Sequence, residues 1–422
     1  MSPAAVQPFS PVELAWIRSQ SPANLSVTTV AIVSQGALDQ ACVKSRIEDR
    51  LLSEERLRQR MGHSHLPLSR PRWQEHPDFQ LSDHFFQHDL SGQTEATSLA
   101  ELVGQLSSQP LDENLPLWQI HLVDLQGERS ALVLRLHAAV ADSSAAAAMA
   151  LRLVDTEDPP ALTELGLEHL QPVQPLRDRG SLAAAATRML SQLITARADR
   201  KNPFRREPNG IKSMHWSAPT DLEEIRSRAS QTGISVSEAL MSAVVGALRR
   251  AVQRHDTPAE DIDMRAVVSI DLRQPDDPLV GTRSALGLLR LPLRAPSIAE
   301  RAAAVHDELV HFSHAPEHLA VLGCETGPGL TMTEIEERSL RLLSQKASIS
   351  MAILDGPRDR QELCGQPIAE FLWWPAMTGN IALGISLVSY AGQIRFVTSC
   401  DQALDLDTDA LLADMTSAAT EL

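Results

Sequence analysis

The sequence predicts an α/β protein built from two lobes. With 422 residues, the chain is longer than one hydrophobic core usually serves, so two domains are expected. In both halves, short runs rich in β-branched residues alternate with longer stretches of helical period. A proline-rich segment separates them, with prolines at 159, 160, 172, 175, 203 and 208. We expect one lobe over residues 1–155, a linker over 156–210 and a second lobe over 211–422.

The first lobe begins with a predicted strand over Val27–Val33, which is rich in β-branched residues. Apolar side chains at helical spacing predict one long helix over 38–61 and a shorter one over 99–106. Two strands follow over 117–125 and 131–140. The second is nearly all apolar, so both of its faces should be covered.

An alanine-rich run ending near Val154 comes directly after Asp142, Ser143 and Ser144. A small polar residue before such a run is typical of a helix N-cap. Residues 131–154 therefore predict a strand, a short turn and a helix.

One helix is expected inside the linker, over 181–198. In the second lobe, Ser235 and Glu238 have the spacing of a capping box at the start of a helix. The patterns predict helices over 220–230, 236–252 and 407–422, strands over 213–218, 264–272 and 287–293, and a hairpin of 381–389 with 394–399.

The composition is that of a soluble globular protein, with 43 % apolar and 22 % charged residues. A formal net charge of −16 argues against a nucleic-acid partner and against simple attraction to anionic lipid. No stretch approaches the roughly 20 apolar residues of a membrane span, and the N-terminus lacks the pattern of a signal peptide. Helix 181–198 leaves a peripheral membrane contact open, although a linker helix lying on its own protein is the simpler interpretation.

The cysteines and histidines predict neither a metal site nor a cofactor. Cys42, Cys324, Cys364 and Cys400 are scattered and are expected to be buried or incidental thiols, consistent with a reducing cytoplasm. His311, His314 and His318 are interrupted by a proline, which weakens a helical metal site.

Eight stretches, taken in order, resemble the bacterial wax ester synthase/diacylglycerol acyltransferase family. The resemblance covers nearly the whole chain and implies a chloramphenicol-acetyltransferase-like fold. In that fold, two α/β lobes face one another, and a tunnel leads acyl-CoA and an alcohol to a shared centre. The stretches are FSPVELAWIRSQSP, RPRWQEHPDFQLSDHF, QPLDENLPLWQIHLVDL, RLHAAVADS, SVSEALMSAVVGALRR, MRAVVSIDLRQPDD, LDGPRDR and SLVSYAGQIRF.

The family motif His-His-x-x-x-Asp-Gly corresponds to the run from His137 to Ser143. The resemblance implies that the second histidine acts as general base on the acceptor hydroxyl and that the aspartate holds the local backbone. Here His137 and Asp142 remain, but Ala138 stands at the base position and Ser143 replaces the glycine. Alanine cannot take a proton, and loss of a positioned general base costs roughly 10²- to 10⁴-fold in rate.

Other family motifs are kept unevenly. The tunnel-wall residues Pro116, Leu117 and Trp118 are intact, and so is the run 389–392. The family has an Asn-Asp pair at the start of a helix, which corresponds here to Ser237 and Glu238. Of the family's Asn-Val-Pro-Gly-Pro turn, this sequence keeps only the Gly-Pro. The pattern, with scaffold kept and polar chemistry lost, indicates a repurposed or lapsed site.

Each candidate site residue also has a structural interpretation. His137 is either a hydrogen-bonded core residue or a replacement base, although strand alternation should point it away from Ala138. Asp142 and Ser143 are explained as a turn and helix cap, since no base adjoins Ser143. Glu238 is explained by its capping box. Ser237 retains a weak hydrogen-bonding role, and Trp118 is a wall residue of a tunnel or a core.

Three functions remain open. The first is O-acyl transfer from an acyl thioester to an alcohol through a non-standard site. The second is another reaction on the same scaffold, such as cyclisation of a polyketide- or lipid-like chain, for which preorganisation can lower the barrier. The third is a non-catalytic lipid-binding protein. All three predict a hydrophobic small-molecule ligand.

Overall fold

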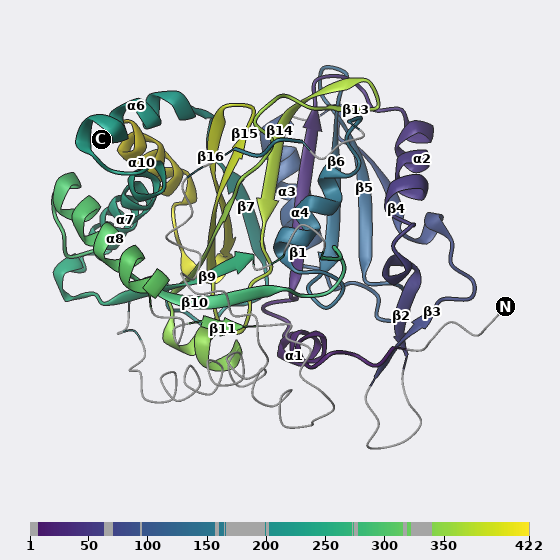
Figure 1. The fold of residues 1–422 in the computed structure, drawn as a ribbon, viewed down its shortest axis with the longest axis horizontal. Helices are drawn as coiled ribbons and strands as arrows, with labels where there is room; N and C mark the ends of the chain where they lie inside the picture. Colours follow the sequence, from purple (N-terminus) through teal and green to yellow (C-terminus); the bar gives the residue numbers. More distant parts are fainter. Residues whose placement is uncertain are drawn as a thin grey trace.

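The computed structural model describes residues 7–62, 71–92, 95–156, 160–163, 165, 199, 202–271, 273, 277–314, 319–321 and 340–421. It confirms the predicted α/β class and the two lobes, which lie side by side in Figure 1. Each lobe is built around its own sheet. Among the described residues, no helix combines the length and apolar character needed to cross a bilayer.

The first lobe contains a six-stranded sheet in the order β13-β14-β1-β6-β5-β4. Its two outer strands on one side come from the second half of the chain, and β14 pairs antiparallel with β1. This crossover was not anticipated. The strands are β1 (Val27–Ser34), β4 (Phe85–Asp89), β5 (Trp118–Leu125), β6 (Arg129–His137), β13 (Glu362–Leu363) and β14 (Gln366–Trp374).

The second lobe contains an eight-stranded sheet in the order β11-β10-β9-β12-β15-β16-β7, with β8 paired to β16. Strand β12 runs parallel to both of its neighbours, and the predicted final hairpin is β15 with β16. The strands are β7 (Lys212–Trp216), β8 (Thr220–Asp221), β9 (Met264–Asp271), β10 (Ser284–Leu291), β11 (Leu319–Val321), β12 (Ile349–Leu354), β15 (Leu383–Tyr390) and β16 (Gln393–Asp401).

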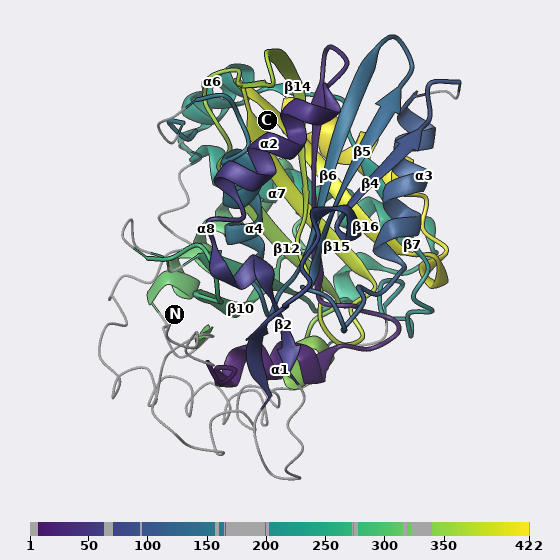
Figure 2. The ribbon, with the colours of Figure 1, turned by 90° about the vertical axis from the view of Figure 1, so that its right-hand side faces the viewer.

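Helices cover the sheets and leave the lobes in contact along β14, β15 and β16 (Figure 2). The first lobe carries α1 (Pro11–Ser19), α2 (Gln40–Arg50), α3 (Glu95–Ser107) and α4 (Ser143–Leu151). The second carries α6 (Leu222–Thr232), α7 (Val236–Arg254), α8 (Ile298–His314) and α10 (Thr408–Thr420). The capping box predicted at Ser235 is present at the start of α7.

Two predicted elements have the wrong bounds. The long helix over 38–61 ends at Arg50, and a short 3-10 turn and a small strand, β2 (Gln59–Gly62), follow it. Strand β2 pairs with β3 (Arg72–Glu75), which gives the apolar residues of this stretch a sheet partner instead of a helical face. The strand predicted over 131–140 ends at His137, because the chain turns there. The linker helix predicted over 181–198 lies outside the described residues.

The expectation of free thiols is wrong for two of the four cysteines. Cys42 on α2 and Cys364 in the β13–β14 turn form a disulfide, although 322 positions separate them in sequence. The crossover of β13 and β14 onto the first-lobe sheet brings the two together. Cys400 is a free, buried thiol, and Cys324 lies outside the described residues.

Candidate active site

The motif turn, residues 137–143, connects the end of β6 to the start of α4 and lies where the second lobe meets the first. The Ala138 N–H donates to the carbonyl of Ser26 at 2.8 Å, and the Thr282 hydroxyl donates to the Ala138 carbonyl at 3.1 Å. Ala138 is only 1 % exposed. Its backbone is therefore fixed from both lobes, and its methyl group is packed in the core.

Both ring nitrogens of His137 are occupied. Nδ1 accepts a hydrogen bond from the Ala139 N–H at 3.0 Å. The ring proton therefore belongs on Nε2, which lies 3.0 Å from Oε1 of Gln20 and donates to it. Burial lowers the pKa of His137 to about 4. A neutral imidazole held in this way has no lone pair to offer a substrate.

The Asp142 carboxylate accepts four hydrogen bonds. Its oxygens receive the Ala145 N–H at 2.9 Å, which caps α4, and the Arg283 N–H at 2.8 Å. Arg273 adds a bidentate pair at 3.1 and 3.0 Å. Both side chains are buried, so the pair is a fully desolvated clamp between the lobes. Burial works to lower the pKa of Arg273, but the charge and hydrogen bonds of Asp142, together with the charges of Asp271 and Asp277, outweigh it and raise that pKa.

Arg273 also contacts a carboxylate that sequence reasoning missed. Its Nη1 lies 3.3 Å from Oδ1 of Asp271, the last residue of β9. Burial and the nearby charge of Asp142 raise the pKa of Asp271 to about 6, although Arg273 works in the opposite direction. Asp271 falls inside the family-like stretch of residues 264–277, but nothing in the one-dimensional pattern connects it to Asp142.

The Ser143 hydroxyl lies 2.8 Å from the Thr28 hydroxyl and accepts the Ala376 N–H at 3.0 Å. The Ser143 carbonyl accepts the Trp373 indole N–H at 2.9 Å. These contacts join the start of α4 to β1 and to the chain that leaves β14. None of these neighbours is a base that could activate Ser143 as a nucleophile.

The retained Pro116, Leu117 and Trp118 lie at the start of β5, where Leu117 contacts the motif turn. The Leu117 carbonyl accepts the His137 backbone N–H at 3.0 Å. The Trp118 indole donates to the Leu57 carbonyl at 2.7 Å and stacks on His84 at 4.4 Å between ring centroids. Trp118 is fully buried, and the position of these residues in a tunnel wall stays a prediction.

Ser237 and Glu238 lie elsewhere, in the first turn of α7, which packs against α8 and α10 (Figure 1). Glu238 accepts the Ser235 N–H at 2.7 Å and contacts Nδ1 of His306 at 2.6 Å. Burial works to raise the pKa of Glu238, but these hydrogen bonds lower it below its usual value. Glu238 is thus accounted for as part of a helix cap. Ser237 is buried in the same turn.

The corner around Gly356 brings two retained motifs together. The Gly356 N–H donates to the Ser389 hydroxyl at 3.0 Å. A Cβ at Gly356 would lie 2.0 Å from the Ser389 carbonyl oxygen, so only glycine fits. The Tyr390 hydroxyl accepts the Gln361 N–H and donates to the Ile368 carbonyl. These residues fix how the chain passes from β12 to β14.

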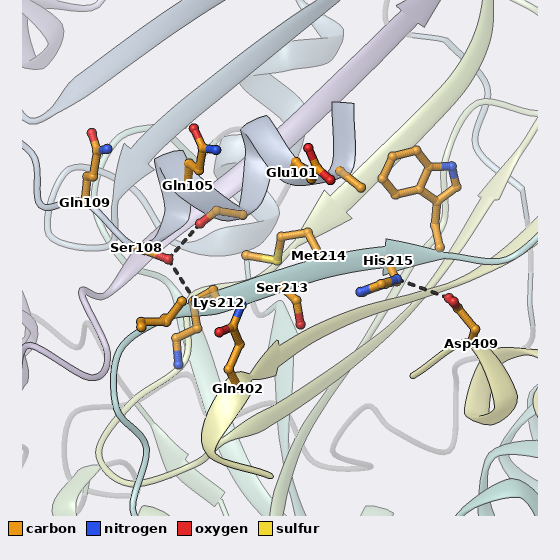
Figure 3. A pocket seen from close by; sticks show the side chains of 14 residues that line it. Glu101, Gln105, Ser108, Gln109, Lys212, Ser213, Met214, His215, Gln402 and Asp409 are labelled. Atoms are coloured by element: carbon orange, nitrogen blue, oxygen red, sulfur yellow. Dashed lines mark hydrogen bonds and ion pairs between the residues drawn. The ribbon is translucent and has the colours of Figure 1, made fainter. Parts of the chain in front are cut away.

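A groove of about 670 Å³ lies between α3 and the edge strand β7 (Figure 3). Its apolar lining includes Met214, which rises from β7 toward α3, while His215 points to Asp409 on the other side. The full lining is Ala100, Glu101, Gly104, Gln105, Ser108, Gln109, Ile211, Lys212, Ser213, Met214, His215, Trp216, Gln402 and Asp409.

A small cavity of about 30 Å³ adjoins this groove. Lys212 and Met214 line both spaces, and the cavity also touches Ser26 and Pro375. The Ser26 carbonyl accepts the Ala138 N–H, and Ala376, which follows Pro375, donates its N–H to the Ser143 hydroxyl. The groove therefore points toward the motif turn, with Met214 between them. A continuous tunnel stays a prediction.

Comparison with known families gives two matches along the chain. A model described as the wax ester synthase/diacylglycerol acyltransferase catalytic domain matches residues 20–207, and one described as the WS/DGAT C-terminal domain matches residues 280–422. Among curated proteins, the probable diacylglycerol O-acyltransferase tgs1 of Mycobacterium tuberculosis (strain H37Rv) is 22 % identical over 424 residues, covering 94 % of this chain and 91 % of that protein.

Solved structures with the same architecture include a wax ester synthase/diacylglycerol acyltransferase from Marinobacter aquaeolei VT8. It has a TM-score of 0.69 at 18 % identity, and the match covers 98 % of both chains. The first condensation domain of the CDA synthetase has a TM-score of 0.66 at 15 % identity, covering 100 % of this chain and 97 % of that one. These likenesses confirm the predicted two-lobed fold.

Proposed function

Because the chain belongs to the wax ester synthase/diacylglycerol acyltransferase family, we propose that it transfers an acyl group from an acyl thioester to an alcohol. The observation that carries this proposal is the α3–β7 groove with its inner cavity, which leads from the surface toward the motif turn. A volume of about 670 Å³ is in the range of small-molecule sites. A cytoplasmic location remains a prediction, and a disulfide is uncommon in that compartment.

The groove suits an aliphatic chain with a polar head. Met214 and Ile211 offer apolar surface, while Gln105 on α3 and Gln109, two residues beyond its end, add amides to the lining. Each methylene buried in such a groove contributes about 0.8 kcal/mol to binding. An acyl chain or a long-chain alcohol would therefore gain affinity from its length.

The direct test is ester formation by the purified protein, given hexadecanoyl-CoA with either hexadecan-1-ol or a diacylglycerol and analysed by mass spectrometry. Ester above the no-enzyme background supports the proposal, and its absence with both acceptors contradicts it. Met214→Trp, which fills the junction between groove and cavity, should shift the preferred acyl chain to shorter lengths. Met214→Leu, which conserves volume, should leave the preference unchanged.

A non-catalytic lipid-binding protein is the second candidate, favoured by the occupied nitrogens of His137 and the buried methyl group of Ala138. It predicts hexadecanoyl-CoA or fatty alcohol binding without turnover. Ala138→His separates the two cases. Acyl transfer gained only in this variant indicates a lapsed enzyme with an intact groove. A rearranged product that is not an ester, formed by the wild type, indicates another reaction class.

A further inference from the structure

Strand β9 presents alternate residues to two different cores. Its even-numbered residues, 264 to 270, lie in the core of the second lobe, whereas Val267 packs in the core around the first lobe. Because side chains alternate along a strand, Asp271 shares the face of Val267. Arg273 reaches Asp142 from the same end of the strand. The Asp271 carboxylate therefore lies at the junction of the lobes, beside the motif turn.

His137 and Asp142, the ionisable residues of the motif turn, are less able than Asp271 to take a proton from a substrate. His137 uses both ring nitrogens and is sealed in the core. The Asp142 oxygens already accept four hydrogen bonds and are 3 % exposed. Asp271 contacts the same guanidinium and also accepts the Arg273 backbone N–H at 2.9 Å, but its side chain is only half-buried, with 39 % of it exposed. Part of the Asp271 carboxylate is therefore accessible while Asp142 stays sealed in the interlobe clamp.

The charges around Asp271 favour proton uptake near neutral pH. Burial and the charge of Asp142 raise its pKa, Asp277 adds in the same direction, and Arg273 opposes them, with the pKa reaching about 6. Arg283, which donates its N–H to Asp142 and pairs with Asp277 at 3.4 Å, is a further cation of this cluster. A general base works best when its pKa lies close to the working pH.

We propose that Asp271 is the general base of the acyl transfer, in place of the histidine that is absent at position 138. This role rests on the proposed function. The Asp271 carboxylate takes the proton of the acceptor hydroxyl while that oxygen forms a bond to the thioester carbonyl carbon. The carbon–sulfur bond then breaks, and the leaving thiolate receives the proton from Asp271. The products are an ester and a free thiol, and the carboxylate is restored.

The test measures CoA release and ester formation from hexadecanoyl-CoA and hexadecan-1-ol by the full chain, between pH 4.5 and 8.5. Wild-type kcat/KM should rise with pH through a midpoint near 6. Asp271→Asn should lower turnover roughly 10²- to 10⁴-fold and abolish that limb. Its Tm should stay unchanged or rise, because the variant removes a carboxylate whose charged form is disfavoured. A merely structural role would lower Tm instead.

Asp263→Asn is the matched control, because Asp263 immediately precedes the other end of β9 and its ion pair with Arg294 is exposed. It should keep wild-type turnover. If Asp271→Asn does not fold, Asp271→Glu serves as the test. Its retained carboxylate should keep turnover and shift the midpoint of the pH profile of kcat/KM. Ester formation that survives Asp271→Asn, or a midpoint unmoved in Asp271→Glu, overturns this role and leaves the proposed function standing. No ester from the wild type overturns both.

Discussion

The motif turn and the Gly356 corner both join distant parts of the chain, but they do so by different means. At the motif turn, a buried carboxylate, a guanidinium and a neutral histidine hold the backbone by hydrogen bonds. At the corner, the backbone of Gly356 lies directly against that of Ser389, so a steric fit decides. The first region depends on charge and the second on shape, so their responses to substitution and to pH should differ.

The largest effect is expected from Asp142→Ala. It leaves the guanidinium of Arg273 buried without its main partner, and breaking a buried pair in this way costs about 3–5 kcal/mol. Urea unfolding measures the loss of stability. Asp263→Ala breaks an exposed pair with Arg294 and should cost less than about 1 kcal/mol. Similar losses for both variants would show that the charge clamp does not hold the lobes.

The histidine of the motif turn should make stability depend on pH. Its folded-state pKa, about 4, lies below the usual 6.5, so the unfolded chain takes up the proton first. This contribution is complete above pH 6.5 and is lost as the pH falls toward 4, with a size on the order of 3 kcal/mol. Unfolding of wild type and His137→Leu at a series of pH values isolates it. If His137→Leu loses as much stability at low pH as the wild type does, the pH dependence belongs to other groups.

The corner should respond to volume and not to pH. In Gly356→Ala, the new methyl group meets the Ser389 carbonyl, and forced overpacking costs about 1–3 kcal/mol at any pH between 5 and 8. Gly92→Ala is the control, because a Cβ there has nothing within 4 Å. Thermal unfolding of both variants measures the difference. A loss of stability in Gly356→Ala that varies with pH would contradict this distinction between the two regions.

Much of the fold was predictable because its signals are local. The β-branched run of β1, the apolar strand β6 and the caps at Asp142 and Ser235 each depend on a few neighbouring residues. The crossover of β14 was not predictable from periodicity, because its partner β1 lies more than 300 positions earlier in the chain. The disulfide between Cys42 and Cys364 follows from the same crossover.

The candidate site was predictable only in part, for a similar reason. Resemblance led to His137, Ala138 and Asp142 as the motif turn, and the structure connects them closely. Arg273, which binds both Asp142 and Asp271, reaches the turn from the second lobe. The motif positions Ser237 and Glu238 were equally good candidates in the sequence. They lie in the first turn of α7, where Glu238 completes the capping box with Ser235.

The crossover also constrains how the protein can be made. Strand β1 sits between β6 and β14, and β14 ends at Trp374. A ribosome must therefore synthesise most of the chain before the first sheet can close. Until then, the growing polypeptide exposes the open edge of β1, a template for pairing with other chains. A fragment that stops at the linker would carry that edge permanently, so the first lobe should aggregate when it is expressed alone.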